Sequence, residues 1–180
     1  MCAKVREKRR LIHKIIIIGG GTAGWMTAST LIKFFPDKKI SLIESPTIPT
    51  VGVGESTLAT IRGWQAMVGI KDSDFMKECD ASYKLSIKFT DFYKKGEAFH
   101  YPFGDPIIKG NQSLLNDWWL KKMLDPTLPS SDFADCTYPQ MALVNKNKCF
   151  LNEDNTLPFD FYRHTAFHFD ATKFGTWLRD

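Results

Sequence analysis

The sequence has no apolar run long enough to cross a membrane, and it has few cysteines. The run IIII at residues 15–18 is far shorter than the roughly 20 residues of a membrane helix, and it is too short for the core of a signal peptide. The four cysteines, at positions 2, 79, 136 and 149, lie far apart and form no CxxC pair. We interpret them as thiols in a reducing compartment, and we expect a cytoplasmic protein without membrane contacts.

The sequence also has little net charge outside its N-terminus. The whole chain carries +4, and the first ten residues, MCAKVREKRR, contribute five basic residues and one acidic residue, which is the entire excess. We interpret residues 1–12 as a basic, solvated tail and expect no nucleic-acid partner. Because 43% of the residues are hydrophobic, residues 13–180 have enough apolar side chains for a globular domain.

The clearest structural pattern is HKIIIIGGGTAGWMTASTLIKFFPDKKISLIES, residues 13–45. It predicts a continuous apolar strand, a glycine turn, a helix that ends at Pro36 and a second strand that ends at Glu44, which is a βαβ unit of a parallel sheet. No second βαβ unit follows, and the last helix breaks off without a stop signal. We therefore predict an α/β domain that is truncated in this chain.

The remaining pattern predicts helices at 58–70, 72–79 and 111–124, a broken helix over 131–148, and a final helix capped by Asp170. Asp72 or Ser73 is expected to cap the second of these. His164 and His168 are spaced by four residues, but their segment alternates like a strand and offers no third ligand, so no metal site is expected.

Residues 81–89, ASYKLSIKF, alternate with a period of two and predict one strand. Its polar face carries Lys84 and Lys88. The alternation by itself leaves open whether that face meets water or a cleft. If it meets a cleft, a lysine amine becomes a chemical reagent.

The glycines at 19, 21 and 24 form a GxGxxG turn between the first strand and its helix, and Glu44 follows twenty residues after the last of them. Gly19 permits the tight turn, Gly21 permits a pyrophosphate to approach the backbone, and Gly24 permits close packing of helix and strand. Glu44 is placed to accept ribose hydroxyls and would repel a 2′-phosphate, which favours FAD or NAD over NADP. The motif alone does not choose between FAD and NAD, and a glycine turn without a ligand has the same spacing.

Four segments, in order, resemble the N-terminal region of flavin-dependent tryptophan halogenases: GGGTAGW (19–25), ESPTIPTVGVGEST (44–57), ASYKLSIKF (81–89) and AFHFDATKF (166–174). The resemblance implies a Rossmann-like FAD-binding domain of the flavin monooxygenase type. It also implies that a partner flavin reductase supplies reduced FAD and that a halide ion is the co-substrate. The substrate would be a small tryptophan-like or indole-like aromatic, and the protein could form a homodimer. Chlorination and bromination are both within its scope.

In such enzymes reduced flavin, oxygen and halide yield hypohalous acid, which reaches a lysine beside the aromatic ring. By this resemblance Lys84 is the catalytic lysine, acting either as an ammonium that donates a hydrogen bond or as an amine that is halogenated. Lys88 lies about 13 Å further along a strand, too far to act on the same atom. The residues that the resemblance or the glycine motif places at FAD are Gly19, Gly20, Gly21, Thr22, Ala23, Gly24, Glu44, Ser45, Ile48, Val51, Val53, Gly54, Glu55 and Ser56.

Two alternatives to a halogenase stay open from the sequence. An FAD-dependent aromatic hydroxylase would share the glycine turn and Glu44 but would not need Lys84. An inactive, truncated nucleotide-binding fragment would hold FAD weakly or act as an interaction module. Glu55 fits either a flavin-side residue or an acid at a helix start. The tryptophan-rich W-x-W-x-x-P signature of halogenases does not occur in these residues.

Overall fold

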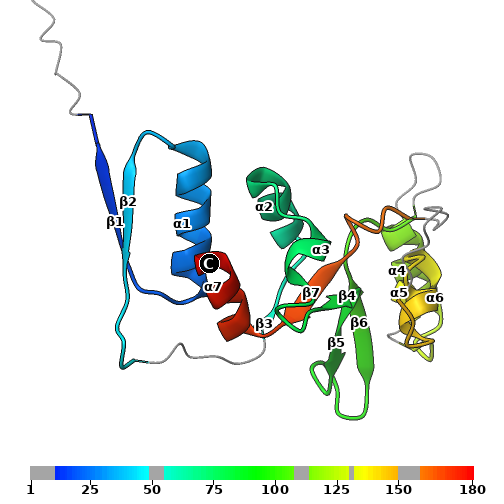
Figure 1. Ribbon diagram of the computed structural model, residues 1–180. Coiled ribbons are helices and arrows are strands. Elements are labelled where there is room, and N and C mark those ends of the chain that lie inside the picture. The colour runs from blue at the N-terminus through cyan, green and yellow to red at the C-terminus, as the bar shows by residue number, and fades with distance from the viewer. Residues whose placement is uncertain (1–10, 49–54, 108–113, 130–131, 150–158) are drawn as a thin grey trace, which may run out of the picture.

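The computed structural model describes residues 11–48, 55–107, 114–129, 132–149 and 159–180 (Figure 1). Most of the basic tail assigned to residues 1–12 lies outside this part of the chain. The same holds for three of the residues assigned to FAD, Val51, Val53 and Gly54.

The predicted βαβ unit is confirmed. It consists of β1 (Lys14–Ile18), α1 (Thr22–Phe34) and β2 (Lys39–Ile43), and the two strands pair in parallel over their whole length. Pro36 stands two residues after the end of α1, as expected, because proline cannot continue a helix.

One face of this two-stranded sheet is open in this chain. Leu42 of β2 faces α1, since its side chain lies 3.6 Å from where a Cβ on Gly24 would be. On the other face Ile16 and Ile18 of β1 are 62% and 86% exposed, and Ile43 of β2 is 55% exposed. Parallel sheets in globular domains are normally covered on both faces. The β1–β2 sheet is therefore an incomplete layer in this chain.

The second sheet has the strand order β3 (Glu55–Ser56), β7 (Ala166–Phe169), β4 (Ser82–Lys84), and both outer strands run antiparallel to β7. Around it lie α2 (Ile61–Val68), α3 (Asp72–Phe75) and α7 (Ala171–Arg179). The core between these elements consists of buried Phe75, Cys79, Phe167, Phe169 and Phe174. Because α7 also packs against α1, it joins the two sheets (Figure 1).

Two predicted helix caps have different outcomes. The Asp170 side chain accepts a hydrogen bond from Lys173 N at 2.9 Å, which confirms it as the cap of α7. At α3 the predicted caps are wrong, because the cap is Lys71 and Asp72 is already the first helical residue. The Asp74 carboxylate accepts from Lys71 N at 2.7 Å, which leaves the Asp72 carboxylate to pair with Arg62 at 2.6 Å.

The single strand predicted for residues 81–89 is wrong. The segment forms β4 and then β5 (Ser86–Thr90), which pairs with β6 (Ala98–Pro102) in a separate hairpin (Figure 1). The chain changes partner at Leu85, because β4 is held by β7 whereas β5 is held by β6. Leu85 is buried, like Lys84 before it, so the alternation of exposure also breaks there.

The helices predicted in the second half are confirmed as α4 (Leu114–Leu124), α5 (Asp132–Thr137) and α6 (Met141–Val144), with α5 and α6 making up the broken helix. They gather at the end of the molecule opposite β1 and β2 (Figure 1). None of the helices in the described ranges has both the length and the apolar character that a membrane crossing requires.

Candidate cofactor and lysine sites

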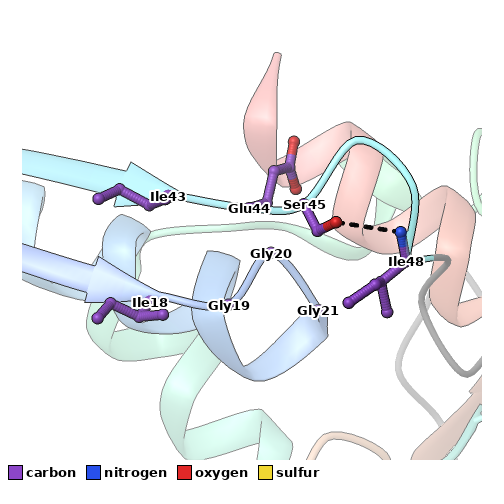
Figure 2. A pocket seen from close by; sticks show the side chains of 8 residues that line it. All are labelled: Ile18, Gly19, Gly20, Gly21, Ile43, Glu44, Ser45 and Ile48. Atoms are coloured by element: carbon purple, nitrogen blue, oxygen red, sulfur yellow. Dashed lines mark hydrogen bonds between the residues drawn. The ribbon is translucent and has the colours of Figure 1, made fainter.

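A cavity of about 510 Å³ opens where β1 and β2 end. Figure 2 shows its lining, which comes from the ends of both strands, the glycine turn and the turn after β2: Ile18, Gly19, Gly20, Gly21, Ile43, Glu44, Ser45 and Ile48. Six of these residues are ones that the sequence assigned to FAD. In α/β proteins the carboxyl ends of parallel strands are the usual place for a nucleotide.

The backbone geometry of the turn explains why two of its positions are glycine. Gly19 has a φ of +115°, a conformation that residues with a Cβ rarely adopt. A Cβ on Gly24 would lie 1.9 Å from the Gly19 carbonyl oxygen, so only glycine permits this contact between α1 and the turn. The roles that the sequence assigned to these two positions agree with this geometry.

The other two glycines border the cavity in different ways. A Cβ on Gly20 would lie 1.8 Å from Glu44 Oε2, so the acid at the end of β2 needs a glycine opposite it. Gly21 has ordinary extended angles, φ −72° and ψ 175°, and a Cβ there would meet no atom within 4 Å. Gly21 thus leaves open space beside the helix start, where a ligand can approach the backbone.

The N-terminus of α1 is suited to an anion. Gly21 is its cap, no side chain caps its N–H groups, and its first turn contains no acidic residue. Uncapped N–H groups at a helix start bind phosphate well. Thr22 donates from Oγ1 to the Ala171 carbonyl at 3.4 Å, so its hydroxyl contacts α7, and Ala23 is exposed.

The turn after β2 is shaped by Ser45. Its Oγ accepts hydrogen bonds from Ile48 N at 3.2 Å and from Thr47 N at 3.3 Å, and the first of these is drawn in Figure 2. This turn brings Ile48 to the cavity wall opposite Gly21. The uncapped helix start, the open Gly21 and the nearby Glu44 carboxylate fit the pyrophosphate and the ribose of a dinucleotide.

Lys84 lies in a second cluster, at the end of β4. The residue is only 8% exposed. Its Nζ donates to Ser56 Oγ at 2.6 Å and to the Thr57 carbonyl at 3.0 Å, and it lies 5.3 Å from the centre of the Phe103 ring. The amine therefore reaches across β7 from β4 to β3.

Burial lowers the pKa of Lys84 below its usual value of 10.5. Within the described residues no carboxylate forms an ion pair with Lys84, so only the hydrogen bonds to Ser56 and Thr57 offset part of the loss of solvation. A larger share of neutral amine at neutral pH follows. Lys88, in contrast, is exposed on β5 in the separate hairpin.

The segment that follows β3 fixes the partners of Lys84. Thr57 N donates to the Phe167 carbonyl at 2.9 Å, and Phe167 N donates to Thr57 Oγ1 at 2.9 Å. Thr57 and Phe103 were not among the predicted site residues. Thr57 could have been found, because it ends the same GVGEST stretch, but the contact of Phe103 depends on the β6 hairpin.

The residues predicted at FAD thus fall in two places. Those before residue 49 lie at the cavity or in the first turn of α1, whereas Glu55 and Ser56 lie in β3 beside Lys84. Residues 49–54 join the two places and are outside the described ranges. The interpretation of Glu55 as a helix-start acid is wrong, because Glu55 pairs with Phe169 in the sheet and α2 begins only at Ile61.

The two histidines considered for metal binding do not act together. The His164 ring contacts the Asp160 carbonyl through Nδ1 at 2.7 Å and accepts from Asp105 N through Nε2 at 3.3 Å. His168 is in β7. In the part of the chain that the structure describes, no three potential ligands gather for a metal.

The glycine turn, the acid at the end of β2 and the cavity between them define a dinucleotide-binding α/β protein. The chain belongs to the flavin-dependent tryptophan halogenase family, since residues 14–180 match the family model described as Tryptophan halogenase. This confirms the family and the fold class suggested by the sequence.

Individual relatives agree. Tryptophan 6-halogenase ThaL of Streptomyces albogriseolus is 34% identical over 94% of this chain and 34% of its own length. The apo structure of VirX1 has a TM-score of 0.81 at 40% identity, over 94% of this chain and 33% of VirX1. Xcc4156, a flavin-dependent halogenase from Xanthomonas campestris, has a TM-score of 0.77 at 28% identity, over 94% and 33% of the two chains. This chain therefore spans about a third of their length.

Proposed function

We propose that this chain carries the FAD-binding and lysine-bearing part of a halogenase that acts on an electron-rich aromatic ring of the tryptophan or indole type. The enzyme would use reduced FAD, oxygen and a halide ion, chloride or bromide, to form hypohalous acid, and Lys84 would direct the halogen to the ring. The observation that carries this proposal is the environment of Lys84, which is buried, lacks a carboxylate partner among the described residues, and bonds to Ser56 of the GVGEST stretch.

When bound, reduced FAD would supply two electrons to oxygen and the halide would supply two more, which gives hypohalous acid and water. The lowered pKa of Lys84 raises its share of neutral amine, which can form an N–X bond with hypohalous acid and release water. An electron-rich ring carbon then takes the halogen and loses its proton, and the amine is restored. The Ser56 and Thr57 oxygens hold the nitrogen in one place before the N–X bond forms.

At the cavity, the same proposal assigns the pyrophosphate to the start of α1 beside Gly21 and the ribose hydroxyls to Glu44. Ser45 and Ile48 form the wall opposite. Thr22, Ala23 and the two residues of β3 are assigned to the cofactor by family resemblance, and so are Val51, Val53 and Gly54.

The partners are part of the proposal. A flavin reductase would deliver the reduced cofactor, and the enzyme would work in the cytoplasm as a monomer or a homodimer. The cytoplasmic assignment rests on the wide spacing of the cysteines in the sequence, which favours thiols in a reducing compartment.

The proposal is tested with Lys84→Met in the intact natural protein, supplied with chemically reduced FAD, bromide and tryptophan. We expect at least about a hundredfold loss of halogenated product, because removal of a positioned acid–base group costs roughly 10²–10⁴-fold. Flavin oxidation should continue at the native rate. Mass spectrometry measures the product, and absorbance measures the flavin.

Lys88→Met is the matched control, since Lys88 is an exposed lysine from the same stretch of sequence. We expect its product yield to stay within about twofold of the native yield. Equal yields in the two variants would overturn the role of Lys84. A hydroxylated product that forms without halide would identify an aromatic hydroxylase instead.

A further inference from the structure

The segment that follows β6 carries the aromatic ring beside Lys84. Phe103 is 4% exposed, and the centre of its ring lies 5.3 Å from Lys84 Nζ. Its N–H donates to the Leu85 carbonyl at 3.1 Å, so the backbone of Phe103 is tied to the residue directly after the lysine. A shift of this segment would therefore move the ring relative to the amine.

Gln140, the residue before α6, holds Phe103 by a second hydrogen bond. The glutamine is completely buried, and its Nε2 donates to the Phe103 carbonyl. Its Oε1 has no hydrogen-bond partner in the part of the chain that the structure describes. A buried polar atom without a partner costs stability, so the bond to Phe103 is the contact that gives this glutamine a role.

His164 fixes the two residues that follow Phe103. Its ring is buried against Gly104, where φ is +78° and where a Cβ would lie 2.1 Å from His164 Cδ2. Nε2 accepts from Asp105 N at 3.3 Å, and Nδ1 donates to the Asp160 carbonyl at 2.7 Å. A carbonyl can only accept, so Nδ1 carries the hydrogen and Nε2 is left as the acceptor. The histidine and the glycine thus set the course of the chain directly after Phe103.

We propose that Gln140 and His164 are positioning residues for Lys84. They hold the Phe103 ring beside the amine, and the ring keeps water away from the nitrogen. This inference rests on the proposed function, and it adds two residues from distant segments to the lysine site. Neither side chain needs to contact the substrate, because its effect on the reaction passes through the Phe103 ring.

The Phe103 ring acts on the amine in two opposite ways. An aromatic ring attracts an ammonium weakly, which favours the charged form. A ring this close also displaces water, which favours the neutral form, and burial is the cause that lowers the pKa of Lys84. The loss of water is therefore the larger effect. A ring that moved away would let the pKa of Lys84 rise toward its usual value of 10.5.

The first test measures the pKa of Lys84 without turnover, in the intact natural protein. Acetic anhydride labels neutral amines, and peptide mass spectrometry follows the labelling of Lys84 against pH. The midpoint of this profile, unlike the rate, does not depend on how easily the reagent reaches the amine. We expect a higher midpoint in Phe103→Ala than in the native protein, and an intermediate midpoint in Gln140→Met.

Gln140→Met separates position from stability. The methionine removes the bond to the Phe103 carbonyl but also removes the unpaired Oε1, so one unpartnered buried oxygen replaces another. We therefore expect little change in the melting temperature. Gln65→Met is the matched control, since Gln65 is 1% exposed and bonds to Asp72 instead. It should lower the melting temperature and leave the Lys84 midpoint unchanged.

His164→Leu and His164→Gln form a second pair. Leucine has no acceptor for Asp105 N, whereas the glutamine side chain can accept through its Oε1. We expect the Lys84 midpoint to rise in His164→Leu and to return toward the native value in His164→Gln. The double variant Phe103→Ala/Gln140→Met should match Phe103→Ala alone, because Gln140 acts through the ring. A further rise in the double variant would overturn the proposal.

The second test measures halogenation with chemically reduced FAD. Gln140→Met should lower the yield of halogenated product about fivefold, the effect of one hydrogen bond, while flavin oxidation and FAD affinity stay at native values. A purely structural glutamine would lower all three together, and that result would overturn the proposal. So would an unchanged Lys84 midpoint in Phe103→Ala or in Gln140→Met. A native protein that does not halogenate, but shows these midpoint shifts, would refute the proposed function and leave the positioning standing.

Discussion

The β1–α1–β2 unit is built from one continuous stretch of chain, whereas the β3–β7–β4 sheet joins distant segments. In the sheet, Phe167 N and Thr57 Oγ1 form a hydrogen bond between residues 110 positions apart. The two regions also differ in burial. Ile18 of β1 is 86% exposed, while Phe167 of β7 and Phe75, which packs against it, are 0% and 1% exposed.

This difference separates two ways of making a site. The cavity at the glycine turn depends on backbone geometry, namely the positive φ of Gly19 and the close approach of Gly24, and these need little packing around them. The environment of Lys84 depends on three strands that meet only in the folded chain. Variants that fill the open space of the first region should therefore change ligand binding, and variants in the core of the second should change stability.

Gly21→Val tests the first region and has the largest expected effect on FAD affinity. The new side chain fills open space at the start of α1, so FAD affinity should fall roughly a hundredfold, the equivalent of two charge-assisted hydrogen bonds. The reason is the lost space, since the Gly21 angles suit any residue. Titration of FAD measures the affinity, and the melting temperature should not change.

Gly24→Val is the matched variant. Its Cβ would lie 1.9 Å from a backbone oxygen, so it should lower the melting temperature as well as the affinity. An affinity of Gly21→Val within a few-fold of native would mean that the pyrophosphate does not lie there.

Phe75→Ala tests the second region. Its ring contacts Phe167, Phe169, Phe174 and Trp177, with centroids 5.1–6.2 Å away. Removing a buried phenylalanine costs about 3–5 kcal/mol of unfolding free energy. Denaturant unfolding measures the loss. Phe92→Ala, at a ring that is 74% exposed, should change it by less than about 0.5 kcal/mol. Similar losses in both would show that Phe75 is not the centre of this core.

Glu44→Ala has a smaller effect in the first region. The variant removes one acceptor for ribose hydroxyls, so FAD affinity should fall about tenfold, as expected for a hydrogen bond to a charged group. Calorimetry measures the dissociation constant. Asp37→Ala, an exposed acid in the turn before β2, is the control and should leave the affinity unchanged. If Glu44→Ala also leaves it unchanged, Glu44 is a strand-end charge only.

The smallest expected effect is the contribution of Cys79, in the second region, to the pH dependence of stability. Burial raises the pKa of its thiol from 9.0 to about 11, so the folded chain keeps the proton at a pH where the unfolded chain loses it. Stability is therefore full below about pH 9 and falls on the order of 1 kcal/mol as the pH rises toward 11. Denaturant unfolding from pH 8 to 11 measures this. Cys79→Ala should lack that part of the slope, and an identical slope would contradict the prediction.

Local sequence signals were sufficient to predict the elements whose contacts lie within a few residues along the chain. The glycine turn, the end of α1 before Pro36 and the Asp170 cap all follow from contacts within a few residues. The strand predicted for 81–89 fails for the opposite reason. Polar and apolar residues do alternate in this segment. The alternation does not reveal that the pairing strand changes from β7 to β6 at Leu85, because both pairings have the same period of two.

The same contrast holds for the candidate site. The sequence by itself determined the glycine turn with its facing acid, because a positive φ and a 1.9 Å approach admit only glycine. Family resemblance singled out Lys84, but only the tertiary structure decided that Lys84 is buried while Lys88 is exposed. Lys84 is buried because β3 and β7, which are more than 100 residues apart in sequence, form one sheet with β4. The burial of a side chain depends on every segment that covers it, so it cannot be predicted from the neighbours in sequence alone.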